Sequence, residues 1–223
     1  MKQLVLDIVA SPVPHLENFV IGRNAELLHA LRELLEAAGS ERQLYLWGAS
    51  GSGKTHLLQA AVAAARERGR VAQYVHAAEF AGAVDSVADL LAVDAVEVLD
   101  DAAQVSLFNR INAVREGCGR ILIAGNAAPA QLDLRIDLST RLGWSLVYQL
   151  QALSDAEKAQ ALATHAAARG FNLQPGVADY LLRHWRRDLP SLLAALDTLD
   201  HYSLETKRPV TVPLLREVLR AEE

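Results

Sequence analysis

The glycine-rich segment GASGSGKT, from Gly48 to Thr55, constrains the fold of this chain more than any other part of its sequence. It fits the pattern G-x-x-x-x-G-K-[ST], whose glycines let backbone N–H groups turn inward around phosphate oxygens. The apolar run Leu44–Trp47 precedes the segment, and a helical pattern from Lys54 to Arg68 follows it. A strand, a glycine loop and a helix in this order predict an α/β fold with a site for the phosphates of ATP or ADP.

Each residue of the loop has a predicted role in nucleotide binding. Lys54 is expected to reach the β- and γ-phosphates, and the Thr55 hydroxyl is expected to ligate Mg²⁺. The helix after the loop directs its positive end at the same place. The predicted nucleotide-binding residues of the loop are Gly48, Ala49, Ser50, Gly51, Ser52, Gly53, Lys54 and Thr55.

Four more short apolar runs predict the rest of a sheet. They are residues 71–75, 96–99, 120–124 and 145–150. Because helical patterns alternate with the runs, we expect a parallel five-stranded sheet with helices on both faces. After residue 153 the pattern becomes entirely helical, beginning with the capping-box residues Ser154 and Glu157. The predicted domains are a tail over 1–16, an α/β nucleotide-binding domain over 17–153 and a small helical lid over 154–223.

Polar residues that follow two predicted strands are candidates for catalysis. The run Val96–Leu99 ends at Asp100 and Asp101, where the Walker B acid of a P-loop protein is expected. Asp100 is predicted to hold the water shell of Mg²⁺ and Asp101 to polarise an attacking water; the alternative is a pair of solvated acids at a turn. Asn126 follows the next strand and is predicted to orient water beside the γ-phosphate as a sensor 1 residue, although a Gly-Asn pair is also an ordinary turn.

The composition of the chain excludes several classes of protein. Its 223 residues carry a formal net charge of −5, which gives no overall attraction to nucleic acid or anionic lipid. The single cysteine, Cys118, excludes an internal disulfide framework. No apolar run approaches the roughly 20 residues of a membrane span, and the N-terminus has no signal-peptide pattern. We therefore expect a cytoplasmic protein with no membrane contact and no direct sequence-specific DNA binding.

Four segments of the sequence resemble the AAA+ part of the bacterial replication initiator DnaA. In the DnaA order they are residues 17–24 (ENFVIGRN), the glycine loop, residues 99–102 (LDDA) and residues 138–144 (LSTRLGW). The resemblance implies an AAA+ P-loop NTPase domain followed by a helical lid. It also implies that Phe19 and Val20 belong to the nucleotide site, and that Arg141 is an arginine finger offered to a neighbouring subunit's nucleotide. A structural salt bridge at the edge of the sheet is the alternative for Arg141.

The N-terminal tail is similar to a different motif. Gln3, Leu4 and Leu6 match the Q-L-x-L pattern that docks on the sliding clamp of the replicative DNA polymerase, although a plain first strand has the same pattern. A DnaA-like domain with this tail, and with no helix-turn-helix pattern after the lid, resembles the Hda family of DnaA regulatory inactivators. The resemblance implies binding to the clamp (the β subunit of DNA polymerase III) and to DnaA. It further implies hydrolysis of DnaA-bound ATP and negative regulation of replication initiation.

One position departs from the DnaA pattern. Pro190, near the start of a lid helix, occupies the place of the family's sensor 2 arginine. We therefore expect weak intrinsic ATP hydrolysis at most, with bound ADP or ATP and Mg²⁺ serving as a structural switch; homo-oligomer formation is left open. Two other functions remain as alternatives: an autonomous ATPase of the DnaC-like helicase-loader type, and a DNA-binding adaptor, which the acidic net charge disfavours.

Overall fold

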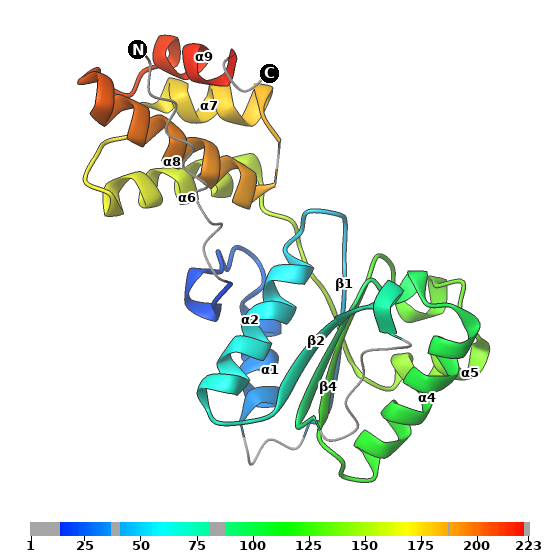
Figure 1. Ribbon diagram of the computed structural model, residues 1–223. Helices are drawn as coiled ribbons and strands as arrows, with labels where there is room; N and C mark the ends of the chain where they lie inside the picture. Colours follow the sequence, from blue (N-terminus) through cyan, green and yellow to red (C-terminus); the bar gives the residue numbers. More distant parts are fainter. Residues whose placement is uncertain (1–13, 37–40, 81–87, 187, 221–223) are drawn as a thin grey trace. The chain divides into compact units, whose positions relative to one another are not determined.

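The computed structural model describes residues 14–36, 41–80, 88–186 and 188–220. The described chain divides into two compact units, of which the first ends at Ala152 and the second begins at Leu153 (Figure 1). The first unit is an α/β domain, and the second consists of helices. Each unit has a hydrophobic core of its own.

A five-stranded parallel sheet forms the centre of the first unit, which confirms the predicted fold class. Its strands are β1 (Gln43–Trp47), β2 (Ala72–His76), β3 (Leu90–Asp94), β4 (Arg120–Gly125) and β5 (Leu146–Gln149). Their order in the sheet is β2-β3-β4-β1-β5, and every neighbouring pair is parallel. Because β1 lies between β4 and β5, the glycine loop that follows it leaves the sheet from an interior strand.

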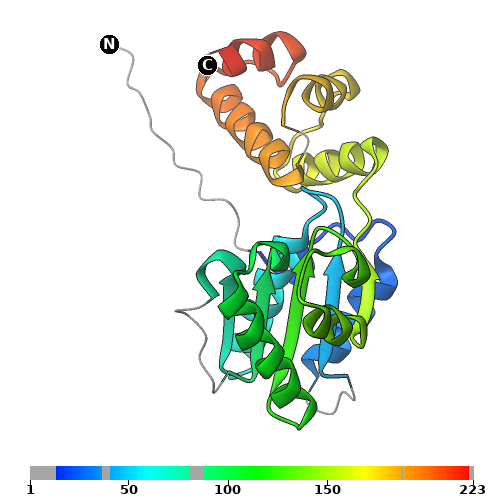
Figure 2. The same cartoon turned by 90° about the vertical axis from the view of Figure 1, so that its right-hand side faces the viewer.

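Helices cover both faces of this sheet (Figure 1). Helices α1 (Ala25–Leu35) and α2 (Lys54–Glu67) pack on one face, and α4 (Asp101–Arg115) and α5 (Ile136–Gly143) pack on the other, which Figure 2 turns toward the viewer. Alternate residues of β1 contribute to the two cores, because Leu44 and Leu46 join the first and Tyr45 joins the second. Burial on both faces explains the continuous apolar runs of the sequence.

The third strand lies earlier in the chain than the sequence predicts. The prediction of a strand over Val96–Leu99 is wrong, because β3 ends at Asp94 and Ala95 takes a left-handed conformation with φ 57° and ψ 49°. The next residues form a 3₁₀ turn, η3 (Val96–Val98). A central parallel strand is buried on both faces, and the run Leu90–Val93 meets that condition. A strand at the predicted place would have to bury the carboxylate of its glutamate, which is costly.

Within the described residues, the second unit consists of four helices, as the sequence predicts for a lid. They are α6 (Asp155–Ala168), α7 (Pro175–His184), α8 (Leu189–Thr206) and α9 (Val212–Arg220). The predicted capping box at α6 is confirmed: the Glu157 N–H donates to Ser154 Oγ over 3.2 Å, and the Ser154 N–H donates to Glu157 Oε2 over 2.7 Å. None of the helices in the described part of the chain is long and apolar enough to span a membrane.

A buried carboxylate joins α6 to α8 within the second unit. Asp197 is 6% exposed, and its Oδ1 lies 2.9 Å from Arg169 Nε and 2.6 Å from His165 Nε2. Arg169 also reaches the carboxylate of Asp200, with 3.7 Å between Nη1 and Oδ2. Because a buried carboxylate needs charged or hydrogen-bonding partners, this cluster fixes the position of α8 along α6.

A test of the first unit's packing uses the glycine at the end of β4. A Cβ atom on Gly125 would collide with the Tyr45 hydroxyl, which is held in the core by a 2.7 Å hydrogen bond to the Ala127 carbonyl oxygen. Since Tyr45 is fully buried, Gly125→Ala is expected to lower the free energy of unfolding by about 1–3 kcal/mol in urea titrations. Gly143→Ala is the control, because no atom lies within 4 Å of its added Cβ. Equal stability of the two variants would contradict this packing argument.

Candidate functional site

The glycine loop lies at the carboxyl edge of the sheet, between β1 and the first turn of α2. Two of its glycines are required by geometry. Gly53 has φ +104°, which only glycine adopts without strain, and a Cβ on Gly48 would lie 2.6 Å from the Leu150 carbonyl oxygen. Side chains at these two positions would strain or block the loop, so the glycines are needed for its conformation.

Lys54 directs its ammonium group into this loop. Its Nζ donates hydrogen bonds to the carbonyl oxygens of Gly48 at 2.8 Å and Ala49 at 3.0 Å. Burial lowers the pKa of Lys54, and the carboxylates of Asp94 and Glu97 oppose that shift. A positive charge held at the centre of a glycine loop is suited to phosphate oxygens.

The carboxylate of Asp94 meets the first turn of α2 beside the loop. Asp94 is 4% exposed, and its Oδ2 accepts hydrogen bonds from Thr55 Oγ1 at 2.6 Å and Tyr74 Oη at 2.9 Å. Its Oδ1 accepts from the Ala95 N–H at 2.9 Å. Burial and the Asp94 charge raise the pKa of Tyr74, so the phenol stays protonated and donates. A loop threonine beside a strand-end aspartate is the pair that holds Mg²⁺ in P-loop proteins.

The structure does not place Asp100 at the end of a strand, where the sequence analysis expected it. Asp100 is the N-cap of α4, and its Oδ1 accepts the Ala103 N–H at 2.7 Å. Asp101 is the exposed first residue of that helix. The acid at the end of the strand is Asp94 instead. The sequence could have indicated it, because Asp94 directly follows the apolar run Leu90–Val93.

A second acid that sequence reasoning missed lies near the end of β4. Glu97, on η3, accepts a hydrogen bond from the Asn126 N–H, with 3.2 Å between the nitrogen and Oε2. Asn126 itself follows β4 and is exposed. The structure therefore brings the predicted sensor residue next to Glu97, and Glu97 also acts electrostatically on Lys54. Its position within a predicted strand concealed it in the sequence.

The segment before α1 borders the glycine loop. Phe19 and Val20 are half-buried, and a Cβ on Gly53 would lie 3.0 Å from the Phe19 ring. Asn24 fixes this segment by donating to the Gln151 carbonyl oxygen at 3.0 Å and accepting the Gln151 N–H at 2.8 Å. Asn24 is the N-cap residue of α1, but its side chain makes this tertiary contact and no cap hydrogen bond.

Arg141 lies on α5, on the other face of the sheet. Its guanidinium carbon is 4.2 Å from the ring centroid of Trp144, which is 57% exposed, and 5.5 Å from that of Phe108. Arg115 lies 4.5 Å from the same tryptophan ring. Within the described ranges no carboxylate forms an ion pair with Arg141, so the salt bridge considered for it is not seen there.

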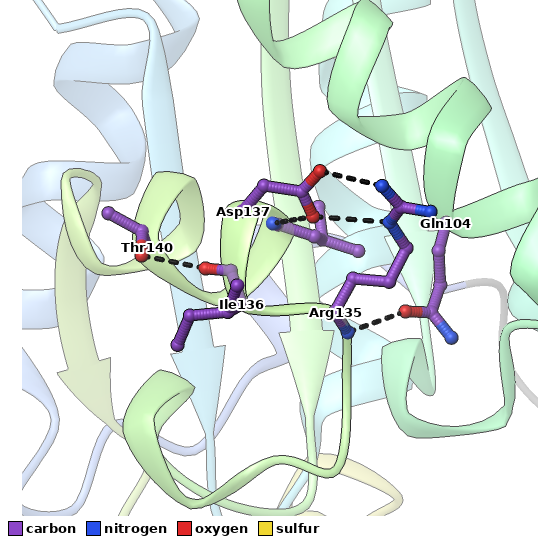
Figure 3. Close-up of polar contacts among 6 residues, drawn as sticks. Gln104, Arg135, Ile136, Asp137 and Thr140 are labelled. Carbon is purple, nitrogen blue, oxygen red and sulfur yellow. Dashed lines mark hydrogen bonds and ion pairs between the residues drawn. The ribbon is translucent and has the colours of Figure 1, made fainter.

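Polar contacts at the start of α5 tie this helix to α4 (Figure 3). The Arg135 N–H donates to Gln104 Oε1 at 2.8 Å. Gln104 Nε2 in turn donates to the Leu99 carbonyl oxygen at 3.2 Å. The Arg135 guanidinium and the Asp137 carboxylate make two hydrogen bonds, of 2.9 and 3.2 Å. The helix that bears Arg141 is therefore anchored at its first turn.

The remaining positions from the sequence analysis are Pro190 and the three residues of the N-terminal tail. Pro190 lies in the first turn of α8, where the Asp188 side chain caps the helix by accepting the Ser191 N–H at 2.9 Å. This placement suits proline, which lacks an N–H, and the side chain has no group for phosphate. Gln3, Leu4 and Leu6 lie outside the described residues.

Comparisons with known proteins agree with this architecture. Residues 13–149 match the family model of the bacterial DnaA ATPase domain, and residues 155–219 match that of the Hda lid domain. Structural similarity extends to AMPPCP-bound DnaA from Aquifex aeolicus, at 26% identity and a TM-score of 0.74, over 87% of this chain and 67% of that one. Domain III of Thermotoga maritima DnaA has 22% identity and a TM-score of 0.76, over 94% of this chain and 97% of that one.

The expectation that Asp94, rather than Asp100, takes part in Mg²⁺ binding is testable. Asp94→Asn keeps the size of the side chain but removes its charge, so we expect Mg²⁺-dependent nucleotide affinity to fall roughly 10–100-fold. Asp100→Asn is the matched control, because asparagine caps a helix as well as aspartate. Titration with a fluorescent ADP analogue, with and without Mg²⁺, measures both. A larger loss in Asp100→Asn than in Asp94→Asn would restore the original assignment.

Proposed function

The chain belongs to the family of the bacterial DnaA ATPase domain, and we propose that it is a regulator of DnaA. In this proposal it docks on the polymerase sliding clamp and promotes hydrolysis of DnaA-bound ATP, which represses initiation of chromosome replication. The Hda lid match over residues 155–219 supports a regulator of this kind. The single structural observation that carries the proposal is the stacking of the half-buried Arg141 on the exposed ring of Trp144.

The proposed cofactor is ADP or ATP with Mg²⁺. Lys54 and the loop N–H groups would hold the phosphates, and Thr55 with Asp94 would hold the metal, which neutralises phosphate charge when bound. The contact of the exposed Thr55 hydroxyl with the buried Asp94 carboxylate and the glycines of the loop fit such a group. DnaA structures with bound AMPPCP support the same proposal for this relative.

Weak intrinsic hydrolysis remains part of the proposal. Glu97, beside Asn126, is the group we propose to orient or polarise water, in place of Asp101. Pro190 offers no cation at the start of α8, so the charge that develops on the γ-phosphate lacks one stabilising partner from that position. The bound nucleotide then serves mainly to fix the structure of the site.

Arg141 is proposed to complete the nucleotide site of DnaA. A guanidinium stacked on an aromatic face keeps its N–H edge directed away from the ring, and no carboxylate of the described chain pairs with it. Such a group can move onto a partner's γ-phosphate without breaking an ion pair. In related phosphoryl-transfer enzymes an arginine supplied in this way raises the rate about 10³–10⁵-fold.

Arg141 and Arg115 both contact the Trp144 ring, but only Arg141 is proposed to reach the nucleotide of DnaA. Substitutions of these two arginines should therefore change the rate of ADP formation differently. With DNA-loaded clamp and ATP-bound DnaA, Arg141→Ala should lower the stimulated rate of ADP formation by about 10³-fold or more. Arg115→Ala removes the other guanidinium that contacts Trp144, and its rate should stay within a few-fold of the parent protein. Equal losses in both variants would mean that this face only binds DnaA. Rapid ATP turnover without DnaA would favour the helicase-loader alternative.

The proposed clamp contact is tested with the tail residues. In the proposed complex, the Gln3 amide would form a hydrogen bond with the clamp and Leu4 would enter an apolar pocket of the clamp. Replacing Gln3 and Leu4 together by Ala removes both groups, so clamp affinity should fall at least about tenfold in surface plasmon resonance. Lys2→Ala is the control within the same tail, and nucleotide affinity should be unchanged in both variants. Unaltered clamp binding by the double variant would disprove a docking role for the tail.

A further inference from the structure

A hollow at the amino edge of the sheet, which we name the arginine hollow, has no part in the nucleotide site. It measures about 270 Å³ and is lined by Arg42, Arg70, Asp89, Gly117, Gly119 and Arg120. These residues come from the starts of four strands and from the turn before β4, whereas the glycine loop lies at the carboxyl edge. Five-residue strands span about 16 Å, so the two sites are well separated.

The charge of the lining is strongly unbalanced. Three guanidinium groups face one carboxylate, in a chain whose formal net charge is −5. The Oδ2 of that carboxylate, on Asp89, already accepts the Val71 N–H at 2.9 Å. Burial lowers the pKa of Arg120, and repulsion from Arg70 and Arg42 lowers it further. A bound anion would relieve this repulsion.

Neutral backbone groups hold two of the arginines in place. Arg120 is 9% exposed, and its Nη2 donates to the Glu36 carbonyl oxygen at 2.8 Å. Arg42 Nη1 lies 3.3 Å from the Gly117 carbonyl oxygen and 3.4 Å from that of Gly119. Carbonyl oxygens orient a guanidinium without cancelling its charge, so the groups are positioned in advance for an anionic ligand.

We propose that the arginine hollow binds a small phosphate-bearing anion, of the size of pyrophosphate or of the phosphate end of a metabolite. The planar N–H fork of arginine matches the oxygens of a phosphate in pairs, and several converging forks select phosphate over a single carboxylate. The volume lies just below the range of about 300–1,000 Å³ usual for drug-sized ligands, which favours a compact anion. Gly117 leaves the backbone open on this side of the lining, because a Cβ added there would meet no atom of a neighbouring segment within 4 Å.

The experiment measures pyrophosphate binding by calorimetry in protein saturated with ADP, so that the glycine loop is blocked. One saturable site is expected. Arg42→Ala and Arg70→Ala should each weaken it at least about tenfold, because each removes a charge-assisted contact. Arg32→Ala is the control, since Arg32 is exposed on α1 and does not line the hollow. Unchanged ADP affinity and thermal midpoint show that each variant is folded.

Cys118 supplies an independent readout. It is exposed, lies between the two lining glycines and is the chain's single cysteine, so a thiol reagent reports on this place alone. Pyrophosphate should slow its reaction with an anionic disulfide reagent severalfold in the parent protein and not in Arg42→Ala. A short single-stranded oligonucleotide that binds instead, with the same arginine dependence, would identify the phosphate source as a nucleic acid backbone.

Three results would overturn the proposal. The first is that neither pyrophosphate nor the oligonucleotide binds saturably. The second is that Arg32→Ala weakens pyrophosphate binding as much as Arg42→Ala and Arg70→Ala do. The third is that pyrophosphate binding disappears in Lys54→Ala but persists in Arg42→Ala and Arg70→Ala. The last result would place the anion in the glycine loop. None of these outcomes depends on DnaA or on the clamp. The absence of anion binding would therefore leave the proposed function unaffected, and a failure of the proposed function would leave the anion site unaffected.

Discussion

The hydrogen bond of 2.6 Å between the Thr55 hydroxyl and the Asp94 carboxylate joins the glycine loop to the sheet. Tyr74 adds a second donor to the same carboxylate oxygen, so three elements, α2, β2 and β3, meet at one buried charge. A buried carboxylate is costly unless it is fully hydrogen-bonded, and these contacts therefore fix the ends of the strands relative to the loop. The geometry of the candidate nucleotide site follows from that constraint.

The parallel sheet places three groups of charged side chains on different parts of the first unit. Its carboxyl edge carries the lysine and the two acids of the candidate nucleotide site, and its amino edge carries the arginine hollow. The face covered by α4 and α5 carries Arg141 and its exposed tryptophan. Because all strands run the same way, residues that precede strands gather at one edge and residues that follow them gather at the other. Phosphate and partner sites can then differ without sharing side chains.

Much of the fold was predictable because its determinants are local or strongly periodic. The five-stranded parallel sheet, α2 after the glycine loop and the four lid helices all follow from runs of apolar residues, glycines and capping residues such as Ser154 and Glu157. The third strand was misplaced because two short apolar runs stand side by side in the sequence. Pairing with β2 and β4 shows that Leu90–Asp94, and not Val96–Leu99, is the third strand. The acid at the end of that strand is therefore Asp94 and not Asp100.

By itself, the sequence determined the glycine loop and the first turn of α8, because backbone sterics at Gly53 and Pro190 act within a few residues. It also determined the family resemblance, which the DnaA ATPase match supports. Only the tertiary structure decided which acid meets Thr55, that Arg115 of α4 lies over the same Trp144 ring as Arg141, and that arginines from three strand starts surround one hollow. Those features join residues far apart in the chain, and burial and strand pairing, which no local pattern encodes, bring them together.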